Sequence, residues 1–295
     1  MISIVSQMNY AQIRAFHRVA AEGSFSKAAA SLFVTQPTIS AQVKALERSV
    51  GVQLFDRRHV VPTDFGRSLL ALTPRLFDLE DQVNELLSAG QGLDKGHIKL
   101  GTDSPSRTAQ LLATYTQRYP GLTVSLATGN ADEMLAALLD YRTDVAVVAK
   151  KSDDPRIEAF KLSEDPLVLF ARTDHHLAKH HSLSLAKLVG QRIILREEGS
   201  NTRELFQRAA TEFGLELTEV LEIDSREAVH EAVAAGLGVG VVAQSEVAND
   251  PRLKSIHIRD AKLIMVEYVL CLRERRGLPI VRAFLETARA SVARA

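Results

Sequence analysis

Two neighbouring stretches near the start of this 295-residue chain decide its fold: AAEGSFSKAA (residues 20–29) and TQPTISAQVKALE (residues 35–47). Gly23 is a helix stop, and the stretch Ser24-Phe25-Ser26 offers an N-cap for a short alanine-rich helix over 27–32. Thr35 is a second N-cap, and Pro37 stands in the first turn of the following helix, where a proline loses no hydrogen bond. With an amphipathic helix over 10–22 before them, these signals predict a helix-turn-helix.

The second helix of such a pair enters the major groove of DNA. Here its exposed positions carry side chains that suit base edges and phosphates, and the candidate DNA contacts are Gln36, Thr38, Ser40, Gln42 and Lys44. The charge distribution agrees with this interpretation. Residues 1–60 hold seven Lys or Arg against three Asp or Glu, a net charge of +4, whereas the whole chain is neutral. A basic module attached to a mildly acidic one is typical of a DNA reader with a sensor domain.

A short β-like segment, 56–62, predicts a wing that places Arg57 and Arg58 near the DNA backbone or minor groove. A long helix is then expected over 64–89, with Pro74 predicting a kink or break inside it. Its apolar residues follow a spacing of three and four, which predicts a paired helix and hence a dimer. The alternative is that this face packs on its own domain. The seam comprises Leu69, Leu72, Leu76, Leu79, Val83 and Leu86.

After a glycine-rich hinge at 90–96, strand patterns alternate with helix patterns. Repeating βα units predict a mainly parallel, doubly wound sheet. Cys271, the one cysteine, lies in an apolar run and is expected to be a buried strand thiol. Strands are predicted at 98–102, 122–127, 145–149, 167–172, 192–195, 220–223, 239–242 and 264–272, with a last helix over 279–294.

Ligands of such sheets bind at the carboxyl ends of the strands, where helix N-termini offer free N–H groups. Three polar segments stand there, 102–107, 197–203 and 224–227. Their hydroxyls and arginines suit an anionic head group, and Asp103, Glu197 or Glu198 could accept an ammonium group. The alternative that Ser and Asn simply cap helices stays open. The candidate effector contacts are Thr102, Asp103, Ser104, Ser106, Arg107, Ser200, Asn201, Thr202, Ser225 and Arg226.

Residues 20–29 and 35–47, followed by GVQLFDR (51–57), resemble the LysR-type DNA-binding signature, and 119–121, 144–147 and 233–240 resemble that family more loosely. The resemblance implies a winged helix-turn-helix plus a long linker helix, followed by a two-lobed α/β domain like the periplasmic binding proteins. The expected domains are 7–65 for DNA binding, 66–90 for the dimerising linker helix and 91–295 for effector binding. Lobe I would be 97–166 and 268–295, and lobe II 167–267.

The resemblance also implies partners. Pro37 would join the DNA contacts of a recognition helix at 36–50, and Ser24, Ser26 and Lys27 would hold phosphates. A homodimer or tetramer would bind double-stranded DNA at promoter dyad sites under the control of a small-molecule effector, with RNA polymerase as a further candidate partner. The wing is about two residues shorter than in the family, which leaves Arg57 and Arg58 as its best contacts. Residues 102–105 and 225–229 also resemble regulators of 2-aminoethylphosphonate catabolism.

Several other functions are not expected. The chain has no apolar run long enough for a membrane span and no secretory signal, so a soluble cytoplasmic protein without a membrane partner is expected. It has no nucleophile elbow, P-loop or HExxH motif, so we expect no enzyme, no catalytic residues and no cofactor. The paired histidines 175–176 and 180–181 lack a ligand set, so no metal site is expected. The rival hypothesis is a ligand-independent architectural DNA-binding protein.

Overall fold

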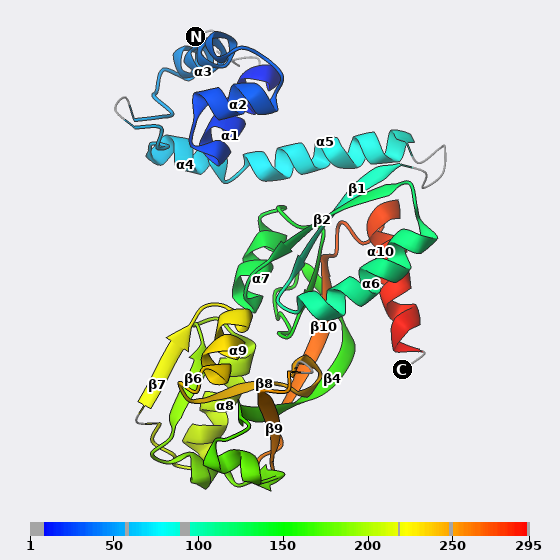
Figure 1. Cartoon of the computed structure of the whole chain (residues 1–295). Coiled ribbons are helices and arrows are strands. Elements are labelled where there is room, and N and C mark those ends of the chain that lie inside the picture. The colour runs from blue at the N-terminus through cyan, green and yellow to red at the C-terminus, as the bar shows by residue number, and fades with distance from the viewer. Residues whose placement is uncertain (1–8, 57–58, 89–94, 218, 248–249, 294–295) are drawn as a thin grey trace. The chain divides into compact units, whose positions relative to one another are not determined.

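The computed structural model describes residues 9–56, 59–88, 95–217, 219–247 and 250–293. Contacts divide the chain into two compact units, Met1–Asn84 and Glu85–Ala295, which we describe separately (Figure 1). Among the described residues, no helix combines the length and apolarity that a membrane span requires.

The first unit begins with the expected helices, α1 (Tyr10–Glu22), α2 (Phe25–Ser31) and α3 (Gln36–Val50). Both helices are capped within the predicted segments. From the stretch 24–26 the structure selects Ser24, whose Oγ accepts a hydrogen bond from the Lys27 N–H, and Thr35 Oγ1 accepts one from the Thr38 N–H. Because Ser24 is itself the cap, α2 begins at Phe25, two residues earlier than predicted. Gly23 ends α1 with φ of 61°, in the left-handed region that glycine enters without strain.

The base of the wing is tied to α3. Glu47 Oε1 accepts a 2.8 Å hydrogen bond from the Leu54 N–H, and Phe55 forms an antiparallel bridge with Pro62. Leu54 is fully buried in the core of this unit. Arg57 and Arg58 lie outside the described residues, so their placement in the wing stays a prediction.

The helix predicted over 64–89, with a kink or break at Pro74, is divided in the structure into two helices, α4 (Asp64–Leu70) and α5 (Thr73–Ser88). The break lies just before Pro74, the residue for which a kink or break was predicted. A continuous helix would press the Pro74 ring against the carbonyl of Leu70 and would leave that carbonyl without an N–H donor. Thr73 Oγ1 donates a 3.1 Å hydrogen bond to that carbonyl instead.

The break divides the predicted leucine seam. Leu69 and Leu76 pack against the core of the helix-turn-helix, whereas Leu72, Leu79 and Val83 are 69%, 51% and 54% exposed. For Leu69 and Leu76 the alternative of packing on the same domain therefore holds, and the predicted seam is not continuous. Pairing through Leu72, Leu79 and Val83 stays a prediction. Leu79 and Val83 are four residues apart and share one face of α5. The side chain of Leu86 lies outside the described residues.

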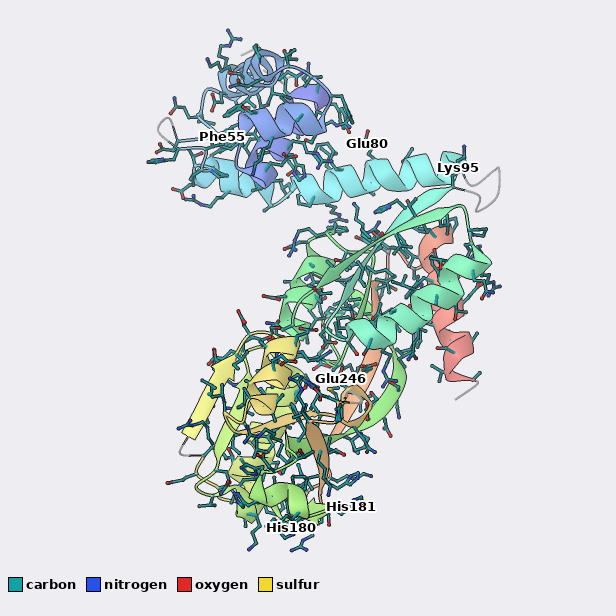
Figure 2. All side chains as sticks on the ribbon, in the orientation of Figure 1. Phe55, Glu80, Lys95, His180, His181 and Glu246 are labelled. Atoms are coloured by element: carbon teal, nitrogen blue, oxygen red, sulfur yellow. The ribbon has the colours of Figure 1, made fainter. Side chains whose placement is uncertain are left out.

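The first turns of α5 belong to the helix-turn-helix unit. His17 Nδ1 on α1 lies 2.8 Å from Thr73 Oγ1, and the His17 ring packs in a tilted arrangement against Phe77, with the ring centroids 4.8 Å apart. Burial, assisted by Arg18, lowers the pKa of His17 to about 4, so the ring is neutral at pH 7. The Tyr10 hydroxyl donates to the Glu80 carboxylate one turn further on (Figure 2).

The second unit contains two sheets joined through one long strand, β4 (Ile157–Arg172). Up to Pro166, β4 pairs with β10; from Leu167 onward it pairs with β8 and β9. Each sheet with its helices forms one lobe (Figure 1). The first lobe has β1 (Gly96–Thr102), β2 (Leu122–Thr128), β3 (Val145–Val148) and β10 (Ile264–Leu272), with α6 (Pro105–Arg118), α7 (Ala131–Leu139) and α10 (Pro279–Val292). The second has β5 (Ser182–Leu183), β6 (Arg192–Arg196), β7 (Glu219–Ile223), β8 (Val239–Ala243) and β9 (Leu253–Ile258), with α8 (Asn201–Glu212), α9 (Arg226–Ala234) and the 3-10 helices η2 (His176–Lys179), η3 (Leu185–Leu188) and η4 (Gln244–Glu246).

The expectation of a mainly parallel sheet is corrected to a mixed one. The pairs β1–β2, β1–β3, β6–β7 and β6–β8 are parallel, but β4 and β10 pair antiparallel with each other and with their other neighbours. The reason is that the chain leaves the first lobe in β4 and returns in β10, running in the opposite direction. The first half of β4, with β5 and β9, was not predicted. Cys271 is a buried strand thiol as predicted, 1% exposed.

Candidate DNA-binding surface and effector crevice

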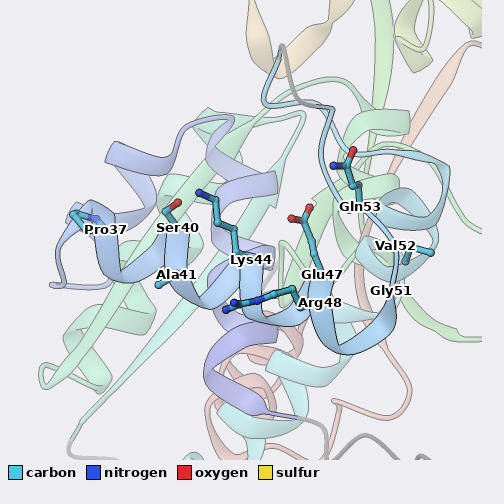
Figure 3. A pocket seen from close by; sticks show the side chains of 9 residues that line it. All are labelled: Pro37, Ser40, Ala41, Lys44, Glu47, Arg48, Gly51, Val52 and Gln53. Carbon is cyan, nitrogen blue, oxygen red and sulfur yellow. The ribbon is translucent and has the colours of Figure 1, made fainter.

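The outward face of α3 carries a stripe formed by Pro37, Ala41, Lys44 and Arg48, spaced by four, three and four residues, and all four are exposed. The opposite face, with Ile39, is buried in the core. Figure 3 shows the groove that these four side chains line together with Ser40, Glu47 and the turn at 51–53. The ionisable groups of the stripe itself are Lys44 and Arg48, and both are cationic. The neighbouring Glu47 carboxylate is hydrogen-bonded to the base of the wing. Such a surface suits the polyanionic backbone of DNA.

The DNA contacts inferred from the sequence lie around this stripe. Ser26, Lys27, Gln36, Pro37, Thr38 and Lys44 are exposed, and Ser24, Ser40 and Gln42 are half-buried. The Ser24 hydroxyl caps α2, and Gln42 lies about 100° around the helix from Ala41. Sequence reasoning did not single out Ala41 or Arg48. Their signal was the spacing of exposed positions opposite the buried ones.

A second candidate site is a small cavity between the two lobes of the second unit. Half of the predicted effector residues line it: Asp103, Ser200, Asn201, Thr202 and Arg226. They come from the end of β1 and from the first turns of α8 and α9, which are the strand ends and helix N-termini that the sequence indicated. The cavity is also lined by Asn130, Ala131, Ala149, Arg196 and Met265.

Hydrogen bonds across this cavity hold the lobes together. Asn201 Nδ2 of the second lobe donates to the Ala149 carbonyl of the first at 2.6 Å, and Arg226 Nη2 donates to the Asp103 carbonyl at 2.7 Å. Asp103 Oδ2 in turn accepts from the Ala149 N–H at 2.9 Å. The free volume is about 10 Å³, roughly the space of one water molecule. A metabolite therefore requires the lobes to separate first.

The other five predicted residues do not line the cavity. Thr102 and Ser104 are buried, and Thr102 Oγ1 accepts a 2.8 Å hydrogen bond from the Ser104 N–H. Arg107 pairs with Asp165, and Ser225 caps α9 by accepting from the Ala228 N–H. Ser106 is exposed. The alternative of helix capping, left open by the sequence, holds for Ser225. The Ser104 hydroxyl makes no capping hydrogen bond to α6 and instead donates to Glu246 Oε1 at 3.2 Å.

Sequence reasoning missed residues that reach the cavity from unremarked positions. Asn130 caps α7 in a capping box with Glu133, a pattern that Asn followed by Glu three positions later makes readable. Ala149 follows directly after β3, and Arg196 ends β6. Nothing in the sequence around Met265 indicated that it lines the cavity. It lies there because β10 brings the chain back between the lobes.

The paired histidines at 175–176 and 180–181 are not arranged as a metal site. His180 and His181 are exposed on the second lobe (Figure 2), and the rings of His175 and His176 are tilted against each other with their centroids 4.4 Å apart. Among the described residues, no group of three or more His, Cys, Asp or Glu side chains is placed to hold a metal ion.

Comparisons of the sequence give a consistent result. Residues 10–67 match the bacterial regulatory helix-turn-helix proteins of the lysR family, and residues 91–293 match the LysR substrate binding domain. The HTH-type transcriptional activator CmpR of Synechocystis sp. (strain ATCC 27184 / PCC 6803 / Kazusa) is 34% identical over 241 residues, which cover 80% of this chain and 79% of CmpR. The RuBisCO operon transcriptional regulator of Allochromatium vinosum is 29% identical over 290 residues, 96% of each chain.

Solved structures share the fold. Full-length CbnR in its complex with target DNA has a TM-score of 0.71 at 24% identity, covering 96% of this chain and 100% of that one. Full-length OxyR from Pseudomonas aeruginosa has a TM-score of 0.75 at 21% identity, covering 97% and 95%. At these identities the likeness shows the fold alone, a helix-turn-helix followed by a two-lobed α/β domain.

The relatives are named as transcriptional regulators, as expected for a chain that is not an enzyme. The two matched regions together span most of the sequence and coincide with the helix-turn-helix and the two-lobed domain described above. The chain therefore belongs to the LysR family of DNA-binding transcriptional regulators, with an effector-binding domain after its helix-turn-helix.

Proposed function

We propose that this regulator binds promoter DNA through the α3 surface and changes that binding when a small anionic or zwitterionic metabolite occupies the crevice between the lobes. One observation carries the effector proposal: Ser200 stands at the N-cap of α8 but makes no capping hydrogen bond. The first N–H groups of α8 therefore meet the cavity without a side-chain acceptor. The acidic group of a ligand would supply acceptors there, close to Arg226, and would be stabilised by the helix dipole.

On the DNA side, we propose a cytoplasmic homodimer or tetramer that binds double-stranded dyad sites and acts with RNA polymerase. The half-exposed Leu79 and Val83 on α5 support pairing through this helix, because two apolar residues on one helix face gain from a partner helix. The residue ranges 7–65, 66–90 and 91–295, and the lobe ranges given above, are our proposed division of these tasks.

The identity of the effector is a narrower question. 2-Aminoethylphosphonate remains one candidate within the proposed class, but the relatives reported above are named for other operons and lend it no support. The class itself rests on the cavity, which is lined by the first turn of α8, by Arg226 and by Asp103.

A thermal-shift screen of the full chain against small carboxylates, sulfate esters, phosphates and phosphonates tests the effector proposal. A true effector at 100 times its dissociation constant should stabilise the fold by about 2.7 kcal/mol. Asn201→Ala should reduce that response, since the amide lines the cavity, whereas Gln110→Ala on exposed α6 should not. If no compound stabilises the protein, a ligand-independent architectural DNA binder becomes the better description.

Substitutions on the DNA surface should separate base reading from phosphate contact. Gln36→Ala should cost about 1–3 kcal/mol of discrimination at one base pair. Lys27→Ala, Lys44→Ala and Arg48→Ala should each weaken binding to every sequence and lower the salt slope by about one. Titrations of operator and scrambled duplexes at several salt concentrations measure both effects, with Lys187→Ala in the second unit as control. Equal loss of discrimination in the lysine variants would contradict the assignment.

We propose that the effector acts through the angle between the lobes, because α5 leads from the helix-turn-helix into the effector-binding unit. A small change of that angle would reset the spacing of two paired DNA-binding modules. Footprint length and DNA bending should then differ with and without effector. Identical footprints and bends would rule this mechanism out.

A further inference from the structure

Four carboxylates and two guanidinium groups gather beside the crevice. Asp165 on β4 and Glu267 on β10 share Arg107, with the Glu267 Oε2 atom 2.5 Å from Arg107 Nε. This half is satisfied, since Asp165 also accepts hydrogen bonds from the Ser245 N–H. The other half consists of Asp103, Glu246 and one guanidinium, that of Arg226.

The second half of the cluster has two carboxylate oxygens to spare. Arg226 Nη1 lies 2.9 Å from Glu246 Oε1, and the Glu246 side chain is only 4% exposed (Figure 2). Its second oxygen, Oε2, is buried and has no hydrogen-bond partner among the described residues. Asp103 Oδ1 is buried in the same way. Buried acceptors without partners are costly, and carboxylates more so than neutral groups.

The positive charges near Asp103 and Glu246 do not neutralise the two carboxylates. Burial raises the pKa of Asp103 to about 7, against the opposing effects of the Ala149 N–H and Arg226 and with the help of Glu267 and Glu246. Burial also raises the pKa of Glu246, with Arg226 and the hydrogen bond from the Ser104 hydroxyl opposing and with Glu267 and Asp165 assisting. Arg196, which is paired with Glu197, and His230 line the cavity beside Glu246. The Arg226 guanidinium pairs with the Glu246 carboxylate and donates its other hydrogen bond to the backbone carbonyl of Asp103, not to the Asp103 carboxylate. A proton or a ligand donor must therefore complete the site.

Asp103 and Glu246 face two small cavities that adjoin. Asp103 lines the cavity described above, and Glu246 lines a neighbouring one. Both cavities share Arg196, Thr202 and Arg226 as walls. Between them, the two cavities are lined by Asp103, by Glu246 and by the first turn of α8.

We propose that Asp103 and Glu246 form the donor-accepting end of the effector crevice, which binds an ammonium group of the effector while its acidic group meets α8. The inference rests on the proposed function and narrows it to compounds that carry both charges. Sequence reasoning had placed Asp103 among the acceptors, but Glu246 reaches the site from η4, more than 140 residues away along the chain.

Matched compounds test this assignment in thermal-shift titrations of the full chain at pH 8: 2-aminoethylphosphonate against ethylphosphonate, and 3-aminopropionate against propionate. The amino compound of a pair should raise the Tm more than its plain partner, and Glu246→Gln should abolish that difference. Equal shifts within both pairs would overturn the inference alone. No shift with any of the four would overturn the anion-binding crevice as well.

A measurement without ligand checks the same two side chains. A carboxyl whose folded pKa is raised above its unfolded value stabilises the fold at low pH, and that stability is lost as the pH rises through the folded value. The wild-type Tm should therefore fall by several degrees between pH 5 and pH 8, and Asp103→Asn should flatten this slope. Asp140→Asn, at an exposed site, should leave the slope as in the wild type. An unchanged slope in Asp103→Asn would overturn the proposal.

Discussion

Replacing Asp144 by alanine should destabilise the effector-binding unit by about 3–5 kcal/mol, the cost of breaking a buried ion pair from one side. Asp144 Oδ1 lies 2.5 Å from Arg275 Nη1, and both side chains are almost fully buried, 5% and 6% exposed. Asp144 Oδ2 also accepts a 2.6 Å hydrogen bond from the Lys99 N–H of β1. The substitution removes both interactions and leaves the Arg275 guanidinium inside the first lobe without this carboxylate.

Denaturant unfolding of the full chain, followed by circular dichroism, measures the change. Asp140→Ala is the matched control, because Asp140 pairs with Arg142 at the surface, where both side chains are 62% exposed. That exposed pair should contribute less than about 1 kcal/mol. A loss in Asp144→Ala no larger than that of the control would show that the buried pair does not hold the first lobe together.

Replacing Leu79 and Val83 together by glutamine should separate the proposed dimer and weaken operator binding by about 100-fold or more, because two linked half-sites bind far more tightly than one. Both side chains are about half exposed on one face of α5, so their loss should leave the helix-turn-helix folded. Glutamine is neutral, and the electrostatic attraction to DNA stays as it was.

Sedimentation analysis and operator titration measure the two effects, and circular dichroism checks the fold. The matched control is Val189→Gln with Leu237→Gln, since these residues are similarly exposed, 58% and 46%, but belong to the second lobe and not to α5. The control should remain paired and bind the operator as the wild type does. A Leu79/Val83 variant that stays dimeric would contradict pairing through this face.

Local signals explain what could be predicted about the DNA-binding part. The N-caps at Ser24 and Thr35 and the stop at Gly23 act over three or four residues, so the sequence contains both partners of each interaction. The burial of Cys271 followed in the same way from its apolar neighbours. Pro74 indicated that the linker helix would break, because a proline acts on the residue four positions before it.

Local signals could not predict which residues of the leucine seam pack against the helix-turn-helix core and which remain exposed. Spacing alone places Leu69 and Leu79 on the same pattern, yet Leu69 contacts the helix-turn-helix core and Leu79 is half exposed. Which of them packs within the domain depends on where α4 turns into α5 and on the contacts of His17 and Phe77 across the chain. These are tertiary contacts that periodicity does not contain.

By itself the sequence determined the helix-turn-helix, the two-domain order, the family and the strand ends where a ligand would meet helix N-termini, because caps, periodicity and motifs are local. Only the tertiary structure decided which side chains meet there. In the structure Thr102, Ser104 and Arg107 make contacts within the protein instead of lining the cavity, and Glu246 lies near Asp103. The reason is that β4 and β10 carry the chain between the lobes, and contacts made by such long returns are set by the packing of whole sheets rather than by neighbouring residues.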